Sequence, residues 1–119
     1  YGDNLDAALT ASVELNQEAQ LSFKTWYLTE KSYDFGTVEI SADGDQWTQI
    51  GDTMTGSSGR WMDQSLFILP DTKFIRFHYH TDSSINGRGW YVYRPRLSFA
   101  NGETLVPEWK SDHWTERNR

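Results

Sequence analysis

Cysteine is absent from this chain of 119 residues, so no disulfide can cross-link the fold and no thiol indicates a redox compartment. The sequence also lacks an apolar run near the roughly 18 residues of a membrane-spanning helix, and its start lacks the basic and then apolar order of a signal peptide. Basic residues are few, 11 against 17 acidic ones, and they are scattered along a chain of net charge -6. We therefore expect a soluble piece of a larger protein, with no membrane insertion and no nucleic acid partner.

Aromatic residues are abundant where cross-links are missing. The chain contains six Trp, six Tyr and six Phe, and each such side chain can bury on the order of 150–250 Å². A single domain of this length buries about two-thirds of the surface that its unfolded chain exposes. We expect these rings to build one core, and some of them to reach the surface.

Apolar and polar residues alternate along most of the chain, which is typical of β-strands with one buried face. One run divides into two sets by alternation: Leu21, Phe23, Thr25 and Tyr27 on one face, and Ser22, Lys24, Trp26 and Leu28 on the other. Because both sets contain apolar groups, this run predicts a central strand. The same alternation places Ile75, Phe77 and Tyr79 on one face of a later strand.

Turn residues separate the predicted strands. Asp43-Gly44 supplies the positive-φ chemistry of a hairpin, and the strand pattern resumes after it. The stretch 51–60 is rich in Gly, Ser and Thr and predicts a loop, as do the polar residues 81–88. Pro95 limits the last strong strand to a position where one ladder donor can be missing.

About seven or eight strands on this spacing, with no convincing helix, predict an all-β fold of two packed antiparallel sheets. The periodicity alone leaves a jelly roll and an immunoglobulin-like sandwich both open. We expect the β-sandwich to occupy residues 1–100. Residues 101–119 mix charged and apolar groups without a clear period, and they form either an edge strand or a linker to a following module.

Two segments carry a resemblance to a known group of domains. Residues 23–47 read FKTWYLTEKSYDFGTVEISADGDQW and residues 74–97 read FIRFHYHTDSSINGRGWYVYRPRL. Together they resemble the accessory β-sandwich domains of secreted bacterial peptidases of the immune inhibitor A and bacillopeptidase F types, modules related to MAM domains. The resemblance implies a jelly roll of MAM/concanavalin-like or galactose-binding-like topology, a secreted or cell-surface location, and contact with other domains of the same polypeptide.

The resemblance also implies a calcium site. Glu30 and Asp34 match an acidic pair of that family, and Asp6, at the entry to the first strand, could join them. Calcium prefers several converging oxygen ligands, which carboxylates supply. The sequence departs from the family pattern at Tyr93 and Arg94, where the relatives usually carry two aspartates. An arginine there repels a cation, and Arg94 or Arg96 could instead pair with the carboxylates through charge-assisted hydrogen bonds.

Catalytic motifs are missing from the sequence. There is no H-E-x-x-H helix, no G-x-S-x-G elbow and no cysteine nucleophile. His78 and His80 could bind zinc from one face of a strand, but no third ligand is defined by the sequence; the other interpretation is a pair of partly exposed polar residues. We therefore expect no enzymatic activity in this segment, although the parent protein is expected to be a peptidase.

Aromatic residues beside polar loops suggest a binding surface instead. Rings next to hydrogen-bonding groups can stack on sugars or grip a peptide, and the candidates are Trp61, Trp90, Tyr91, Tyr93 and Arg94. The alternative for these rings is core or rim packing, which is the stronger interpretation for Trp90. Two functions follow: a non-catalytic accessory module that packs on or spaces a catalytic domain, and a carbohydrate- or protein-binding adhesion module.

Overall fold

The computed structural model describes residues 5–28, 35–81 and 89–112, and these contain nine strands and no helix. Accordingly, they include no helix long and apolar enough to cross a membrane. In chain order the strands are β1 (Leu5–Ser12), β2 (Ala19–Leu28), β3 (Phe35–Ser41), β4 (Thr48–Met54), β5 (Met62–Ile68), β6 (Phe74–Thr81), β7 (Gly89–Phe99), β8 (Thr104–Leu105) and β9 (Lys110–Asp112).

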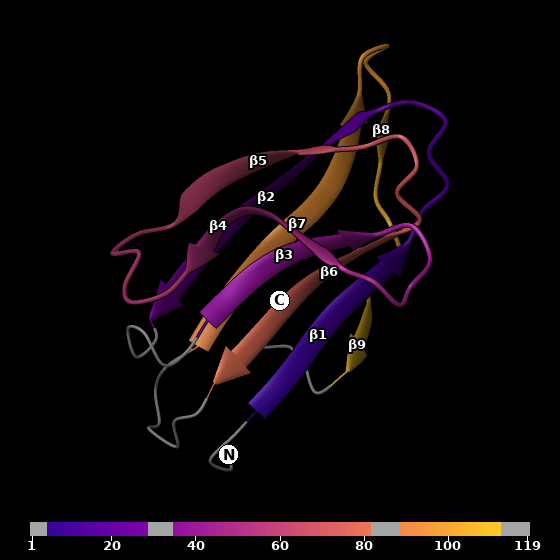
Figure 1. The fold of residues 1–119 in the computed structure, drawn as a ribbon. Coiled ribbons are helices and arrows are strands. Elements are labelled where there is room, and N and C mark those ends of the chain that lie inside the picture. Colours follow the sequence, from indigo (N-terminus) through magenta and orange to yellow (C-terminus); the bar gives the residue numbers. More distant parts are fainter. Residues whose placement is uncertain (1–4, 29–34, 82–88, 113–119) are drawn as a thin grey trace.

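The strands form two antiparallel sheets that pack face to face (Figure 1). Sheet A has the order β4-β3-β6-β1-β9, and sheet B has the order β5-β2-β7-β8. The chain changes sheet at every connection except β3 to β4 and β7 to β8. The prediction of an all-β sandwich is confirmed, and this repeated crossing fits a jelly roll better than a simple meander.

The core lies between the two sheets and follows the predicted alternation. On β2, Leu21, Phe23 and Thr25 are buried, and on β6, Ile75, Phe77 and Tyr79 are buried, so both facial assignments are confirmed. The ring of Phe77 is central, with its centroid 4.9 Å from Phe23 and 5.8 Å from Trp90. Each such fully buried apolar side chain contributes about 1.5–3 kcal/mol to folding.

Trp90 belongs to this core. It is fully buried, and its indole Nε1 donates a hydrogen bond to Thr25 Oγ1 at 2.7 Å. The Thr25 hydroxyl donates in turn to the backbone oxygen of Tyr91 at 2.9 Å. Across the core, Gly36 leaves room for the indole, because a Cβ there would lie 2.7 Å from the ring. Packing and a buried hydrogen bond hold the ring inside, which supports the packing interpretation of Trp90 over the ligand-binding one.

The β3–β4 hairpin is confirmed, but β4 is longer than the sequence suggests. Gly44 has a φ of 85°, as the turn prediction requires. Residues 51–54, which we expected in a loop, pair with β3 up to the register Gly36↔Met54, with a bulge between Gly36 and Val38. The prediction was wrong here because edge strands pair through the backbone, so a polar, glycine-containing stretch can join a sheet.

A β-bulge interrupts the pairing of β2 with β7. Ser22 pairs with Arg96 and Lys24 with Tyr93, so Arg94 and Pro95 lie together opposite Phe23. Arg94 has a φ of 52°, in the left-handed region that L-residues other than Gly rarely adopt. Because a bulge interrupts the ladder, Pro95 needs no donor there, as predicted.

Residues after 100 contribute to both sheets. β8 pairs with β7, and β9 pairs with β1. Between them, Trp109 packs its ring on Phe77 at a centroid distance of 5.2 Å, and its Nε1 donates to the Pro95 oxygen at 3.4 Å. In the described part of this segment, β8 and β9 are therefore edge strands, as one of the two alternatives predicted. A module that follows the segment stays a prediction.

Candidate functional site

Four aromatic rings lie close together on the outer side of sheet B, and we call them the aromatic face: Trp26, Trp61, Tyr91 and Tyr93. Trp26 pairs with Tyr91 across β2 and β7, and their ring centroids are 5.4 Å apart. Trp61 and Tyr93 lie 6.4 Å apart in an edge-to-face contact. These last two are 54% and 44% exposed, so large ring surfaces face solvent.

A polar depression of about 230 Å³ adjoins the aromatic face. Lys24 connects the two features, because it lies directly opposite Tyr93 on β7 and opposite Asp63 on β5. Directly paired residues of neighbouring strands project from the same face of a sheet. The residues lining the depression are Ser22, Phe23, Lys24, Asp63, Gln64, Ser65 and Arg96.

The bulge shapes the boundary between the rings and the depression. It lies between the pairs Ser22–Arg96 and Lys24–Tyr93, both of which project toward this side. The guanidinium carbon of Arg94 lies 5.2 Å from the centre of the Tyr93 ring, and Arg96 Nη1 donates to the Arg94 oxygen at 3.3 Å. Hydrogen-bond donors, one carboxylate and exposed rings therefore lie close together on the outer side of sheet B. This combination can bind a ligand but offers no paired nucleophile and base.

A second polar group of side chains, the ion-pair cluster, lies on the outer side of sheet A. Glu39 pairs with Arg76 Nε and lies 3.3 Å from His78 Nδ1. The Arg76 guanidinium also stacks on the Trp47 ring, 4.0 Å from its centroid. Thr37 Oγ1 donates to Glu39 Oε2 at 3.4 Å. The Glu39 carboxylate and the Arg76 guanidinium neutralise each other, as in a structural ion pair.

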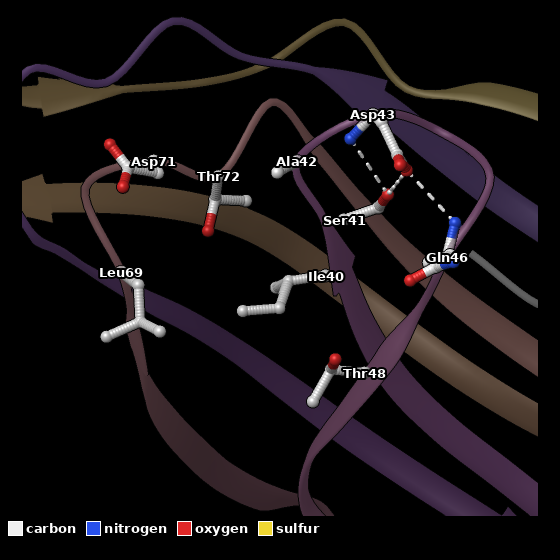
Figure 2. A pocket seen from close by; sticks show the side chains of 9 residues that line it. All are labelled: Ile40, Ser41, Ala42, Asp43, Gln46, Thr48, Leu69, Asp71 and Thr72. Atoms are coloured by element: carbon white, nitrogen blue, oxygen red, sulfur yellow. Dashed lines mark hydrogen bonds between the residues drawn. The ribbon is translucent and has the colours of Figure 1, made fainter.

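A shallow pocket of about 280 Å³ opens at the end of the sandwich, between the β3–β4 turn and the β5–β6 turn (Figure 2). Asp43 on its rim accepts hydrogen bonds from the backbone N–H groups of Asp45 at 2.8 Å and Gln46 at 3.0 Å, and from the Ser41 hydroxyl at 3.1 Å. These bonds hold the pKa of Asp43 below its ordinary value of 3.8. Its carboxylate is used by the turn, which supports the turn-forming interpretation of this residue.

The predicted calcium ligands cannot be placed. Glu30 and Asp34 lie outside the described residues, and Asp6 pairs through its backbone with His80 while its side chain also lies outside the description. Within residues 5–28, 35–81 and 89–112, no three acidic or histidine side chains gather into a metal site. Calcium binding therefore stays a prediction.

Comparisons with known proteins point to one class of protein. No family model matches the chain. Bacillopeptidase F of Bacillus subtilis (strain 168) is 29% identical over 107 residues, which cover 77% of this chain and 7% of that protein. Pre-pro-metalloprotease PrtV of Vibrio cholerae serotype O1 is 26% identical over 120 residues, which cover 88% of this chain and 13% of that protein.

The chain thus spans only a small part of each relative, while most of the chain itself is matched. Both relatives are named as peptidases. The similarity is that of a peptidase-associated domain rather than of a whole enzyme.

Sequence reasoning found three of the four rings on the aromatic face but did not name Trp26 as a binding candidate. Its alternation on β2 already placed it with Lys24, away from the core. What the sequence did not contain was the register that sets Trp26 beside Tyr91 and Lys24 between Tyr93 and Asp63. The polar depression was missed for the same reason, because its lining comes from three strands.

Proposed function

We propose that this chain is a non-catalytic accessory module of a secreted or cell-surface bacterial peptidase, and that it packs on or spaces the catalytic domain. The observation that carries the proposal is the alignment of most of this chain with a small segment of two separately named peptidases. A rigid two-sheet sandwich with one core supports a spacing or docking role. The relation to MAM domains belongs to the same proposal.

The test uses the full-length protein that carries this chain, with and without residues 1–119. Deletion should leave the turnover of a short peptide substrate within about twofold, because the reacting groups lie elsewhere, and should shorten the half-life of activity on heating. The isolated chain should not hydrolyse labelled casein. Hydrolysis by the isolated chain, or a deletion that changes neither half-life nor expression, contradicts the proposal.

Calcium at Glu30, Asp34 and Asp6 is part of this proposal and has a separate test. A bound ion stabilises the folded state by mass action, so chelation should lower the melting temperature of the wild type. The Asp34→Asn variant should have lost that response. An identical melt with and without chelator removes calcium from the proposal.

A second candidate function, a carbohydrate- or protein-binding module, is favoured by one observation. Trp61 and Tyr93 contact each other and are still 54% and 44% exposed, although single-domain proteins bury most of their large rings. Exposed Trp and Tyr next to Arg are typical of binding surfaces. A glycan array with the wild type and Trp61→Ala tests this candidate, and binding by neither counts against it.

A further inference from the structure

We propose that the polar depression and the adjoining rings of the aromatic face bind an acidic polysaccharide. The inference rests on the binding-module candidate, for which it supplies the site and the ligand class. It does not depend on whether the module also packs on a catalytic domain.

The geometry of the surface suits a chain of sugar units. Trp61 and Tyr93 are 54% and 44% exposed, and aromatic rings with this much surface in solvent can pack against the apolar faces of pyranoses. Beside them, the depression alternates donors and acceptors: Lys24 and Arg96 donate, Asp63 accepts, and serine hydroxyls do both. Sugar hydroxyls need such mixed partners.

The charge of the surface selects an anionic sugar. The described residues that line the depression include two cations, Lys24 and Arg96, and one carboxylate, that of Asp63. Arg94 adds a third cation beside the Tyr93 ring, in a protein whose net charge is -6. Within the described part of the chain none of these three cations forms an ion pair with a carboxylate. A local excess of positive charge on an acidic protein attracts carboxylates or sulfates, and arginine binds them with two parallel hydrogen bonds.

A peptide fits this surface less well than a polysaccharide. The depression spans β5, β2 and β7, and β2 is an interior strand paired on both sides, so a peptide strand could not add to β2, and the free edge of β5 lies on the side away from Tyr93 and Arg96 on β7. Apart from Phe23, whose side chain is buried, the lining is polar, and it offers no apolar pocket for an anchoring side chain.

The backbone at Arg94 supports a positioning role for the bulge. A non-glycine residue at positive φ is strained relative to a relaxed conformation, and such residues concentrate at binding sites. At this position the left-handed conformation holds the guanidinium beside the Tyr93 ring, next to the depression. Glycine would keep the turn without that strain, so an arginine here fits a ligand contact better than a purely structural need.

The experiment is affinity electrophoresis of the whole chain in native gels that contain polygalacturonate, dextran sulfate or neutral dextran. We expect retardation by at least one acidic polymer and none by dextran, and the comparison of the two acidic polymers identifies carboxylate or sulfate as the preferred group. Tyr93→Ala and Arg94→Gly should each weaken binding at least about tenfold. Arg94→Gly should fold, because glycine accepts the positive φ.

Matched controls remove a ring or a positive charge elsewhere. Phe67→Ala deletes a ring that is 69% exposed on the same side of sheet B, but two residues beyond Ser65 and outside the depression and the aromatic face. Lys110→Ala deletes an exposed cation on β9 of sheet A. Both should bind within about twofold of the wild type. The proposal is overturned if no acidic polymer retards the chain, if Lys110→Ala weakens binding as much as Arg94→Gly, or if poly-L-glutamate binds as tightly as the polysaccharides.

Discussion

The two outer faces of the sandwich use polar and aromatic residues in opposite ways. On sheet A, Arg76 and His78 both contact Glu39, and the three side chains are only 17–24% exposed. Arg76 also lies over Trp47, so the ring and the cation cover each other. On sheet B, Trp61 and Tyr93 keep about half of their surface in solvent, and Lys24 shows no ion pair in the described residues although Asp63 lies directly opposite.

The comparison separates side chains that stabilise the fold, on sheet A, from side chains that remain free to bind a partner, on sheet B. Charges that are satisfied by neighbours in the same sheet can add to stability. Rings and cations left in solvent add little to stability, but they keep their full capacity to bind a partner. The face of sheet B is therefore where a ligand is expected, and substitutions there should affect binding far more than folding.

The largest test compares two aromatic residues of β7 that project to opposite sides. Trp90→Ala should lower the free energy of unfolding by about 3–5 kcal/mol, because it empties a fully buried indole site. Tyr93→Ala should change it by less than about 0.5 kcal/mol, as is usual for exposed positions. Both values come from urea unfolding followed by circular dichroism. A loss at Tyr93 close to that at Trp90 would show that the aromatic face is part of the core.

Alternation on β2 and β6 predicted the inner layer correctly, since a period of two fixes which residues share a face. The same reasoning could not find the polar depression. Its residues come from β2, β5 and β7, and the pairing of Lys24 with both Asp63 and Tyr93 depends on strand register across long stretches of sequence. The bulge at Arg94 shifts that register, and no local signal other than the following proline marks it.

The candidate ligand-binding residues also divide into those that local alternation could place and those that depend on distant contacts. Trp90 and Tyr93 are near neighbours of similar type, and the sequence favoured packing for Trp90 without showing what its ring packs against. Burial of Trp90 depends on a glycine across the core, Gly36, which leaves space for the indole, and on the hydroxyl of Thr25. Such complementarity between distant positions cannot be seen in a single sequence. Residues 51–54 were assigned to a loop because backbone pairing at a sheet edge leaves little trace in composition.

The second test probes the buried hydrogen bond beneath the aromatic face. Thr25→Val keeps the shape of the side chain but removes the acceptor of the Trp90 indole N–H, which should cost about 1–3 kcal/mol. Thr25→Ser is the matched control, because it keeps the hydroxyl and loses one methyl group, worth about 0.8 kcal/mol. Thermal unfolding should rank the wild type above Ser and Ser above Val. The reverse order of the two variants would mean that packing, and not the hydrogen bond, fixes Trp90.

The third test measures the contrast between the faces directly with two double-mutant cycles. The cycle of Glu39→Ala and Arg76→Ala on sheet A should give a coupling of about 1 kcal/mol, because the pair is partly buried and hydrogen-bonded. The cycle of Lys24→Ala and Asp63→Ala on sheet B should give less than about 0.5 kcal/mol, because the two side chains are exposed and unpaired. Equal couplings would remove the distinction between a satisfied and an available face.

The smallest expected effect concerns Asp43. Like Glu39 on sheet A, its carboxylate is hydrogen-bonded by neighbouring groups. Its carboxylate accepts hydrogen bonds from Ser41 and from two backbone N–H groups, which lower its folded-state pKa below 3.8. A lowered folded-state pKa gives stability that is present above the ordinary pKa and is lost as pH falls through the folded-state value.

Asp43→Ala should therefore melt slightly below the wild type at pH 7. The difference in melting temperature between the two proteins should close as the pH is taken well below 3.8. A gap at Asp43 that stays constant down to low pH would mean that the turn depends on the shape of the side chain and not on its charge.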